Sequence, residues 1–218
     1  MKRYKLNYFD DSLNFTLEDH NGKVKSDFAI NICIFGTKLT DKLTLRKKYI
    51  GKESDIKYIQ AYGAGFTLNQ TIIEIESKIF KVQLNIWVTI EGKSSQTRPS
   101  FYKIPTGAIF VIDLSDKETF DEVKLWIEKL WKESDKGRIP TIILGNKSAL
   151  QNIDTKFDLE INDYIINLNK SVTDDLLMVD YFKINTENSF NVNKVFKKII
   201  LHSIFFDYMH NKKIRLGN

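Results

Sequence analysis

The sequence predicts an α/β fold of three layers, in which helices cover both faces of a mainly parallel, six-stranded sheet with one antiparallel hairpin pair. Two observations support this prediction. Short apolar runs alternate with segments of helical periodicity from about residue 30 to the end of the chain, which is typical of parallel sheets covered by helices. The 218 residues, 42% hydrophobic and 28% charged, suit one domain with a substantial core.

The expected strands are runs of apolar and β-branched residues. Phe66 to Glu76 and Phe80 to Val88 are separated by only three residues, which predicts the antiparallel hairpin. The other expected strands are Ile30 to Phe35, Ala108 to Leu114, Thr141 to Leu144 and Leu176 to Ile184. Because ligands bind at the carboxyl ends of the strands in such sheets, a site is expected in the loops that follow them.

The expected helices follow from periodicity and capping residues. They are Asp41 to Ile50, a helix capped by Ser115 or Asp116, Phe157 to Leu168, and a long closing helix from Val192. In the second helix, large apolar side chains that include Trp126 and Trp131 recur at helical spacing. We therefore interpret these tryptophans, and Trp87 in its strand, as core residues rather than as a platform for stacking bases.

Residues 1–27 are expected to form an N-terminal extension, and residues 28–218 one domain with a long C-terminal helix. Apolar residues alternate with polar ones in the extension, and Asn21-Gly22 is a strong turn signal. This pattern predicts an extra hairpin or strand ahead of the core, with a disordered extension as an equal alternative.

A run that reads Gly-Thr-Lys-Leu-Thr-Asp-Lys-Leu follows the first strand and opens a helix. A phosphate-binding loop needs glycines so that backbone N–H groups can wrap a phosphate, a lysine for its charge, and a hydroxyl for magnesium. Gly36 and Lys42 stand at the right spacing. Asp41 occupies the second glycine position, and Leu43 occupies the hydroxyl position with Thr44 beside it. The run is therefore a degenerate match.

Five further segments carry a family resemblance. They are residues 86–92, 98–102, 107–120, 145–150 and 191–196. In order and spacing they resemble the Trp-Asp-Thr-Ala-Gly-Gln strand end, the second switch region, the fourth strand with the third helix, the guanine-reading Asn-Lys-x-Asp loop and the last helix of Rab-like small GTPases of the Ras superfamily. The resemblance covers about residues 28–206 and implies a P-loop NTPase-like fold.

The resemblance also implies that several magnesium and catalytic positions have changed. Val88 stands where the family has an aspartate that holds magnesium through water. Glu91 stands at the glycine whose amide meets the terminal phosphate, and Gly92 at the glutamine that orients water. Ala61 matches the first-switch threonine that reaches magnesium.

The guanine-reading positions are partly kept. Asn146 and Lys147 match the family, whereas Ala149 replaces the aspartate that accepts hydrogen bonds from the base. Asn185-Thr186-Glu187 stands in place of the last base-contacting loop, which usually reads Ser-Ala-Lys. The expected degenerate nucleotide-binding set is Gly36, Asp41, Lys42, Leu43, Thr44, Asn146, Lys147 and Ala149.

Estimated free energies indicate that these substitutions weaken nucleotide binding. A carboxylate at Asp41 about 4 Å from a phosphate costs on the order of 4 kcal/mol at a surface-like dielectric. The hydrogen bonds lost at Ala149 cost about 1.5–3 kcal/mol each. Even half of the total, roughly 4–5 kcal/mol, weakens binding about a thousandfold or more. We therefore expect no cofactor or only weak GTP or GDP, no bound magnesium, and impaired hydrolysis with no catalytic residue.

The first functional hypothesis is a pseudo-GTPase that acts as a protein-interaction module through its switch-like surfaces. The alternative is a GTP-binding or other nucleotide-binding switch with weak or partner-assisted GTPase activity. No metal site is expected, because the three histidines show no metal spacing with the single cysteine, Cys33, which is expected to be buried.

The remaining expectations concern location. The net charge of +5 is spread along the chain, so no nucleic-acid partner is expected. The sequence shows neither a secretory signal nor a membrane span, which predicts a cytoplasmic protein. No cysteine follows Cys33, which predicts no C-terminal prenyl anchor. The apolar and then basic end of the closing helix is expected to pack on the core, with peripheral membrane contact as the alternative.

Overall fold

The computed structural model describes residues 16–17, 26–37, 40–50, 56–75, 78–90, 92–146, 155–184 and 189–216. In these residues the strands form one sheet, in the order β1-β4-β5-β2-β6-β7-β8, with β3 paired to β4. The long strands are β2 (Phe28–Phe35), β4 (Ala64–Ile75), β5 (Lys78–Thr89), β6 (Gly107–Asp113), β7 (Thr141–Asn146) and β8 (Val179–Ile184). The short strands are β1 (Thr16–Leu17) and β3 (Lys57–Ile59).

The predicted fold class is confirmed. β2 pairs in parallel with β5 and β6, and β7 pairs in parallel with β6 and β8. β4 and β5 form the expected antiparallel hairpin, which pairs Ala64 with Thr89 at one end and Ile75 with Lys78 at the other. The two short strands both lie antiparallel to β4. β1 lies in the N-terminal extension, where the alternation of apolar residues had suggested an extra hairpin or strand. β3 was not predicted, because three residues are too few for an alternating pattern to reveal.

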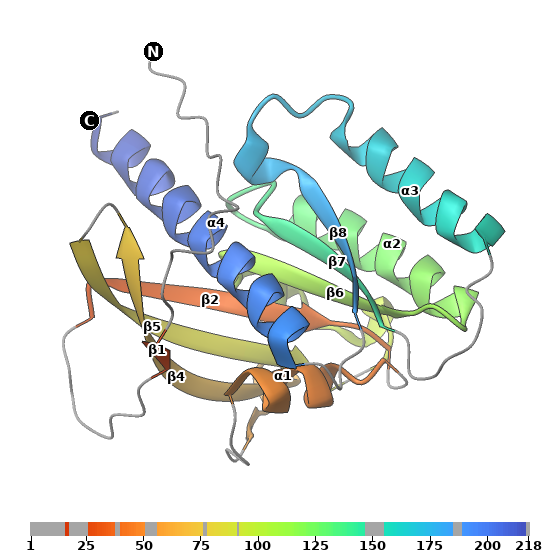
Figure 1. The fold of residues 1–218 in the computed structure, drawn as a ribbon, viewed down its shortest axis with the longest axis horizontal. Coiled ribbons are helices and arrows are strands. Elements are labelled where there is room, and N and C mark those ends of the chain that lie inside the picture. The colour runs from red at the N-terminus through yellow and green to blue at the C-terminus, as the bar shows by residue number, and fades with distance from the viewer. Residues whose placement is uncertain are drawn as a thin grey trace.

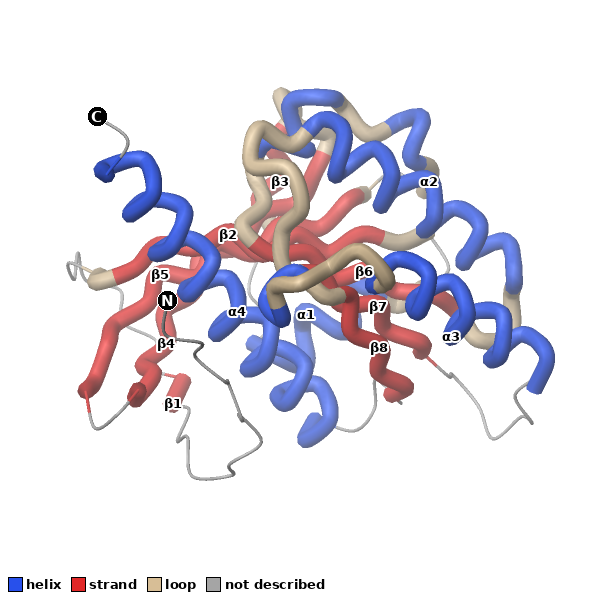
Figure 2. Tube along the Cα trace, turned by 90° about the horizontal axis from the view of Figure 1, so that it is seen from above, coloured by secondary structure: helices blue, strands red, loops and turns tan. Residues whose placement is uncertain are grey.

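The helices cover both faces of the sheet (Figures 1 and 2). They are α1 (Lys42–Ile50), α2 (Lys117–Glu133), α3 (Thr155–Asn169) and α4 (Ser189–Leu216). The chain also forms three short 3-10 helices, η1 (Ser94–Gln96), η2 (Pro99–Lys103) and η3 (Asp175–Leu177), within the described residues. The expectation of an extended run from Leu176 was wrong at its start, because η3 turns the chain before β8.

Two apolar clusters lie on opposite faces of the sheet. One includes Ile34 and Val88 from the strands and packs under α1 and α4. The other includes Phe35 and Phe110 and packs under α2 and α3. The chain approaches itself closely where β6 passes α4, because a Cβ added at Gly107 would lie 2.2 Å from Ser203 Oγ. Ile34 and Phe35, which are neighbours in β2, belong to different clusters. Successive side chains of a strand point to opposite faces of the sheet.

The aromatic and cysteine expectations agree with this packing. Trp126 and Cys33 are fully buried, and Trp87 and Trp131 are half-buried against the cluster under α2 and α3. Burial also raises the pKa of the Cys33 thiol well above its usual range. Such a thiol is a small apolar core group.

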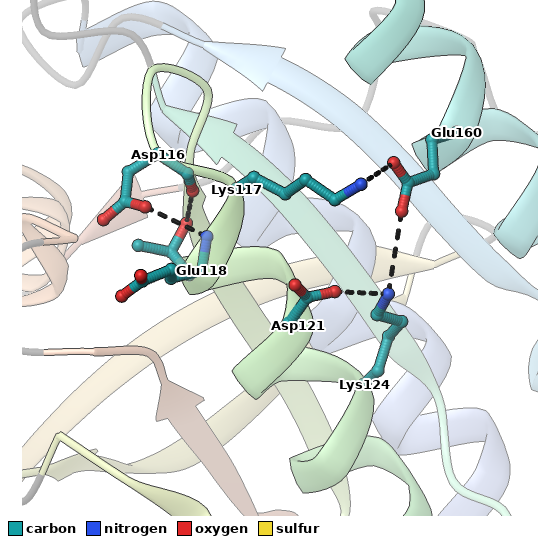
Figure 3. Close-up of polar contacts among 7 residues, drawn as sticks. Asp116, Lys117, Glu118, Asp121, Lys124 and Glu160 are labelled. Carbon is teal, nitrogen blue, oxygen red and sulfur yellow. Dashed lines mark hydrogen bonds and ion pairs between the residues drawn. The ribbon is translucent and has the colours of Figure 1, made fainter.

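Charged side chains join α2 to α3 (Figure 3). Glu160 of α3 accepts from Lys117 Nζ at 2.5 Å and lies 3.8 Å from Lys124 Nζ. Lys124 also contacts Asp121 of its own helix at 2.5 Å. Exposed pairs of this kind contribute about 0–1 kcal/mol each, so the apolar contacts below them hold the two helices.

The ends of the chain are described only in part. Thr16 and Leu17 pair with Thr71 and Ile72 of β4 at the edge of the sheet. The Asn21-Gly22 turn signal lies outside the described residues. No described helix is both long and apolar enough to cross a membrane.

Candidate functional site

The carboxyl ends of the parallel strands meet at one edge of the sheet. The pairing sets Ile34 of β2 beside Val88 of β5, and Asp113 of β6 beside Asn146 of β7. The loop after β2, which carries the degenerate phosphate-loop run, therefore lies at the same edge as the loop after β7, which carries the guanine-type run. This is the edge where ligands bind in open α/β sheets.

Gly36, the first residue after β2, has close neighbours in the described part of the loop. A Cβ added to Gly36 would lie 2.3 Å from Thr40 Oγ1 and 2.9 Å from the Val111 carbonyl oxygen. The Thr37 carbonyl accepts hydrogen bonds from the Thr40 hydroxyl at 2.9 Å and from the Lys42 ammonium at 2.7 Å. Lys42 is only 5% exposed. Lys42 is thus buried at the start of α1 and donates to the backbone of the preceding loop.

Asp41 has an unusual backbone. Its φ is 42°, in the left-handed region that glycine adopts freely and that aspartate tolerates better than most residues. Its carbonyl accepts from Leu45 N at 2.9 Å and so closes the first turn of α1. The position where the phosphate-loop pattern has a glycine therefore keeps a glycine-like backbone, although it carries a carboxylate.

The Asp41 side chain contacts the next loop along the edge. Its Oδ2 accepts a hydrogen bond from Asn146 Nδ2 at 3.2 Å, between residues 105 positions apart in the chain. Asn146 is 4% exposed, whereas Asp41 is exposed. The structure thus brings together the expected phosphate-type and guanine-type residues, and it does so through their own side chains.

The residues at the expected magnesium positions are apolar. Leu43 follows Lys42 in α1 and is 46% exposed, and Thr44 beside it is half-buried. Val88 is fully buried in the cluster under α1 and α4. Neither Leu43 nor Val88 has an oxygen in its side chain, and magnesium binds oxygen ligands. The neighbouring Thr89 is 2% exposed, and its hydroxyl donates to the Ile34 carbonyl at 3.4 Å.

Several expected site residues are not described. Lys147 and Ala149 lie outside the described residues, as do Glu91 and residues 185–187. Of the guanine-type loop, only Asn146 can be placed.

Residues 92–104, which we call the second-switch-like segment, are held against α2. Ser94 N donates to the Glu122 carboxylate, and the Ser94 carbonyl accepts from Lys129 Nζ at 3.0 Å. Trp126 Nε1 donates to Thr97 Oγ1 at 3.1 Å. The sequence analysis missed Glu122 and Lys129 as anchors. Their spacing of four and three residues from Trp126 puts all three on one face of the helix, and that was the available signal.

Aromatic side chains fix the other end of this segment. Phe101 and Tyr102 are 0% and 1% exposed. The Phe35 ring lies 5.6 Å from the Phe101 ring and 6.2 Å from the Tyr102 ring, centroid to centroid. The Tyr102 hydroxyl donates to the Ser94 carbonyl at 3.4 Å. Burial raises the pKa of Tyr102 to about 12, because the phenolate would lose its hydration.

Residues 57–63, which we call the first-switch-like segment, are held more loosely. The segment comprises β3 and a turn, and Ala61 in the turn is exposed. The Ala61 carbonyl accepts from Arg98 Nη1 at 3.4 Å, at an exposed position. The Tyr62 and Trp87 rings form a T-shaped pair with their centroids 5.5 Å apart. Ala61, which matches the magnesium-reaching threonine, has no hydroxyl.

The acidic residues between β6 and α2 make structural contacts. Of the two predicted caps, Asp116 caps α2, because its Oδ1 accepts from Glu118 N at 3.0 Å, as Figure 3 shows. Asp113 Oδ1 accepts from the backbone and hydroxyl of Ser115 at 2.9 and 2.6 Å. These carboxylates have structural partners that account for their positions.

Comparison with known proteins agrees with this geometry. The family model described as "Ras family" matches residues 31–204. The chain is 28% identical to the Ras-related protein RabH of Dictyostelium discoideum, over 81% of this chain and 82% of that protein. It is 22% identical to the Ras-related protein Rab-12 of Mus musculus, over 86% and 73%, respectively. It is 29% identical to the Ras-related protein RABA4b of Arabidopsis thaliana, over 60% and 56%.

Proposed function

Because the chain belongs to the Ras family, we propose that it is a Rab-like protein with impaired GTP binding and hydrolysis that acts as a protein-interaction module. This pseudo-GTPase works without a bound nucleotide or holds GTP or GDP only weakly. Magnesium has no role in it.

The attachment of the second-switch-like segment to α2 is the observation that carries the proposal. In working GTPases the switch segments are ordered by the terminal phosphate and its magnesium ion, and are released after hydrolysis. Here Ser94 and Thr97 have their partners on α2, and Phe101 and Tyr102 are buried. A segment that the protein itself holds needs no phosphate to order it, which supports one locked state.

The chemistry of the site supports the same proposal. The side chains of buried Val88 and exposed Leu43 have no oxygen, so they cannot supply the magnesium ligands expected at these positions. Gly92 has no side chain that could orient a water molecule. Positioning and electrostatics supply nearly all of the catalysis in phosphoryl transfer. The chain's own residues therefore offer little to hydrolysis.

A surface beside the switch-like segments suits a protein partner. Phe66 and Trp87 lie 4.7 Å apart between ring centroids, Tyr62 packs against Trp87, and Leu68 is 55% exposed on β4. The pairing of Phe66 with Trp87 and of Leu68 with Asn85 puts these side chains on one face of the sheet. We call Tyr62, Phe66, Leu68 and Trp87 the aromatic patch. Aromatic side chains are enriched in protein interfaces.

Calorimetry on protein stripped of nucleotide tests the first half of the proposal. We expect neither GTP nor GDP to bind more tightly than about 100 μM, roughly −5.5 kcal/mol, with or without magnesium. Nanomolar, magnesium-dependent binding would contradict the proposal.

Paired surface variants test the second half. Leu68→Asp puts a charge on the aromatic patch, and Leu159→Asp is its matched control, since Leu159 is 62% exposed on α3. In proximity labelling inside cells, Leu68→Asp should lose partners that both the parent and Leu159→Asp keep. If the two variants label the same partners, the aromatic patch is not the surface that binds them.

One observation favours the alternative, a nucleotide-binding switch with weak or partner-assisted activity. Lys42 is buried at the start of α1, close to where the pattern puts a phosphate. If Lys42 binds phosphate, Lys42→Ala should abolish a nucleotide-induced rise in melting temperature that the parent shows. A parent that shows no such rise with a panel of nucleotides argues against the alternative.

A further inference from the structure

We propose that the partner of the aromatic patch is a protein segment rich in aspartate and glutamate, and that Lys57 and Arg98 bind its carboxylates. This inference rests on the proposed function and deepens it, because it names the chemistry of the partner. It depends on where these two cations lie relative to the aromatic patch, and on the charges around them.

Lys57 lies beside the aromatic patch in the same row of the sheet. Antiparallel pairing sets Lys57 of β3 opposite Phe66 of β4, and Phe66 opposite Trp87 of β5. Residues directly opposite each other in an antiparallel pair have side chains on the same face, with Cβ atoms about 4.5–5.5 Å apart. Lys57 is exposed, so its ammonium is available to a ligand that covers the two rings.

Arg98 lies next to a second residue of the aromatic patch. Its Nη1 donates to the Ala61 carbonyl at 3.4 Å, and its Nε would lie 3.9 Å from a Cβ added at Gly63. Ala61 and Gly63 flank Tyr62, which belongs to the patch. The Arg98 side chain is exposed, and a guanidinium has five N–H donors in a planar fork that suits a carboxylate.

These two cations lack the carboxylate partners that neighbouring lysines have. Lys103, in the same segment as Arg98, contacts Asp135 at 3.1 Å. In the part of the chain that the structure describes, neither Lys57 nor Arg98 makes an ion pair. Both charges can therefore pair with carboxylates of another molecule without first breaking a pair within the chain.

The surrounding segments have the same sign of charge. The first-switch-like and second-switch-like segments contain four basic residues and no acidic residue, as the sequences of residues 57–63 and 92–104 show. On the face of β4 and β5 that carries the patch, the described acidic residue is Glu74. It lies eight positions after Phe66, which is roughly 26 Å at about 3.3 Å per residue.

The helices on the other side of the molecule differ in charge. α2 and α3 carry more acidic than basic residues. The basic character is thus a property of the region around the aromatic patch. Complementary charges steer association and orient a partner, and aromatic rings supply the contact area at the centre of an interface. An acidic segment with a few large apolar side chains fits both properties.

The test begins with a displayed library of random peptides, selected for binding to the full chain. We expect the enriched peptides to contain more acidic than basic residues, together with leucine or aromatic residues. An enriched set that is neutral or basic would overturn the proposal, and so would a library that yields no binder.

Charge reversals then locate the binding site of the tightest enriched peptide by fluorescence anisotropy. Lys57→Glu and Arg98→Glu should each weaken binding about tenfold, because a repulsion replaces an attraction. The matched control is Lys132→Glu, which makes the same change in net charge at an exposed position on α2 and should bind as the parent does. Unchanged melting temperatures would show that all three variants remain folded.

Three results of this measurement would overturn the proposal. The first is unchanged affinity in Lys57→Glu and Arg98→Glu. The second is an equal loss in Lys132→Glu, which would mean that net charge alone acts. The third is tighter binding of a single-stranded oligothymidine than of the peptide, with the same losses in the two variants, since the anionic partner would then be a nucleic acid.

Leu68→Asp separates this proposal from the proposed function. If Leu68→Asp abolishes binding of the same peptide while the two charge reversals do not, the aromatic patch remains the binding surface and only its preference for acidic partners is wrong. If the peptide binds Leu68→Asp as tightly as the parent, the aromatic patch is not its binding surface, and both proposals for this surface fail.

Discussion

The two switch-like segments touch through Arg98, yet the structure holds them in different ways. The second-switch-like segment inserts Phe101 and Tyr102 into the core and is hydrogen-bonded to Glu122, Trp126 and Lys129 of α2. The first-switch-like segment consists of a three-residue edge strand and an exposed turn. Because its aromatic rings are buried, the second-switch-like segment is part of the core, whereas the first-switch-like segment lies on the surface.

This difference indicates where motion remains available. Segments with few buried apolar contacts open at low free energy, and core segments open only with the whole domain. We therefore expect the first-switch-like segment to open locally and the second to open with global unfolding. We therefore expect a partner that binds the aromatic patch to contact a mobile first-switch-like segment beside a fixed second-switch-like segment.

Replacement of Phe101 by alanine should give the largest effect. The ring is fully buried against Phe35 and near Trp87, so its loss leaves a cavity. We expect the free energy of unfolding in urea to fall by about 3–5 kcal/mol. Tyr62→Ala in the first-switch-like segment should cost only about 0.5–1.5 kcal/mol, the usual value of one aromatic pair. Equal losses for the two variants would abolish the contrast.

The pH dependence of Tyr102 should give the next effect. Burial raises the pKa of Tyr102 to about 12, whereas an unfolded tyrosine titrates near 10. Between these pH values Tyr102 has lost its proton in the unfolded chain but keeps it in the folded chain. Its contribution to the free energy of unfolding is therefore fully present below about pH 10 and is lost as the pH rises toward 12. The loss is about 2–3 kcal/mol for this shift.

Denaturant melts from pH 9 to 12 measure this dependence. Tyr102→Phe should show a shallower alkaline loss than the parent. Other tyrosines whose pKa is raised, such as the partly buried Tyr164, titrate in both proteins and cancel in the comparison. Parallel curves for parent and variant would mean that Tyr102 is accessible to water, and hence that this end of the segment is not fixed.

The smallest expected effect concerns one hydrogen bond. Thr97→Val keeps the shape of the side chain but leaves the Trp126 indole N–H without its acceptor. We expect a cost of about 1–2 kcal/mol, seen as roughly tenfold faster hydrogen exchange of the amides of residues 94–97. Arg98→Ala, which removes the exposed contact to Ala61, should stay within about 0.5 kcal/mol of the parent. A larger effect for Arg98→Ala would reverse the proposed order.

Much of the fold was predictable from local pattern. The hairpin of β4 and β5, the buried strands β6 and β7, and the Asp116 cap of α2 all follow from residue types within a few positions of each other. The short strand β3 and the turn η3 were not predictable, because their form depends on pairing with β4 and on the approach to β8.

The candidate site was predictable only as a set of positions. Gly36, Lys42 and Asn146 were identified by spacing, and the structure brings them to one edge of the sheet. The contacts that these regions make were not visible in the sequence. Glu122 and Lys129 read as ordinary surface residues of an amphipathic helix, and nothing local in the chain links Asp41 to Asn146.

The sequence by itself determined the order of the long strands and the α-helices, which depends on periodicity and capping within short stretches of chain. Its motifs, by their resemblance in order and spacing, also indicated the family and the residue types at each functional position. Only the tertiary structure decided that Asp41 meets Asn146 across 105 residues, and that α2 holds the second-switch-like segment. Such contacts depend on which loops the sheet brings together, because hydrogen bonds form over about 3 Å and carry no signature along the chain.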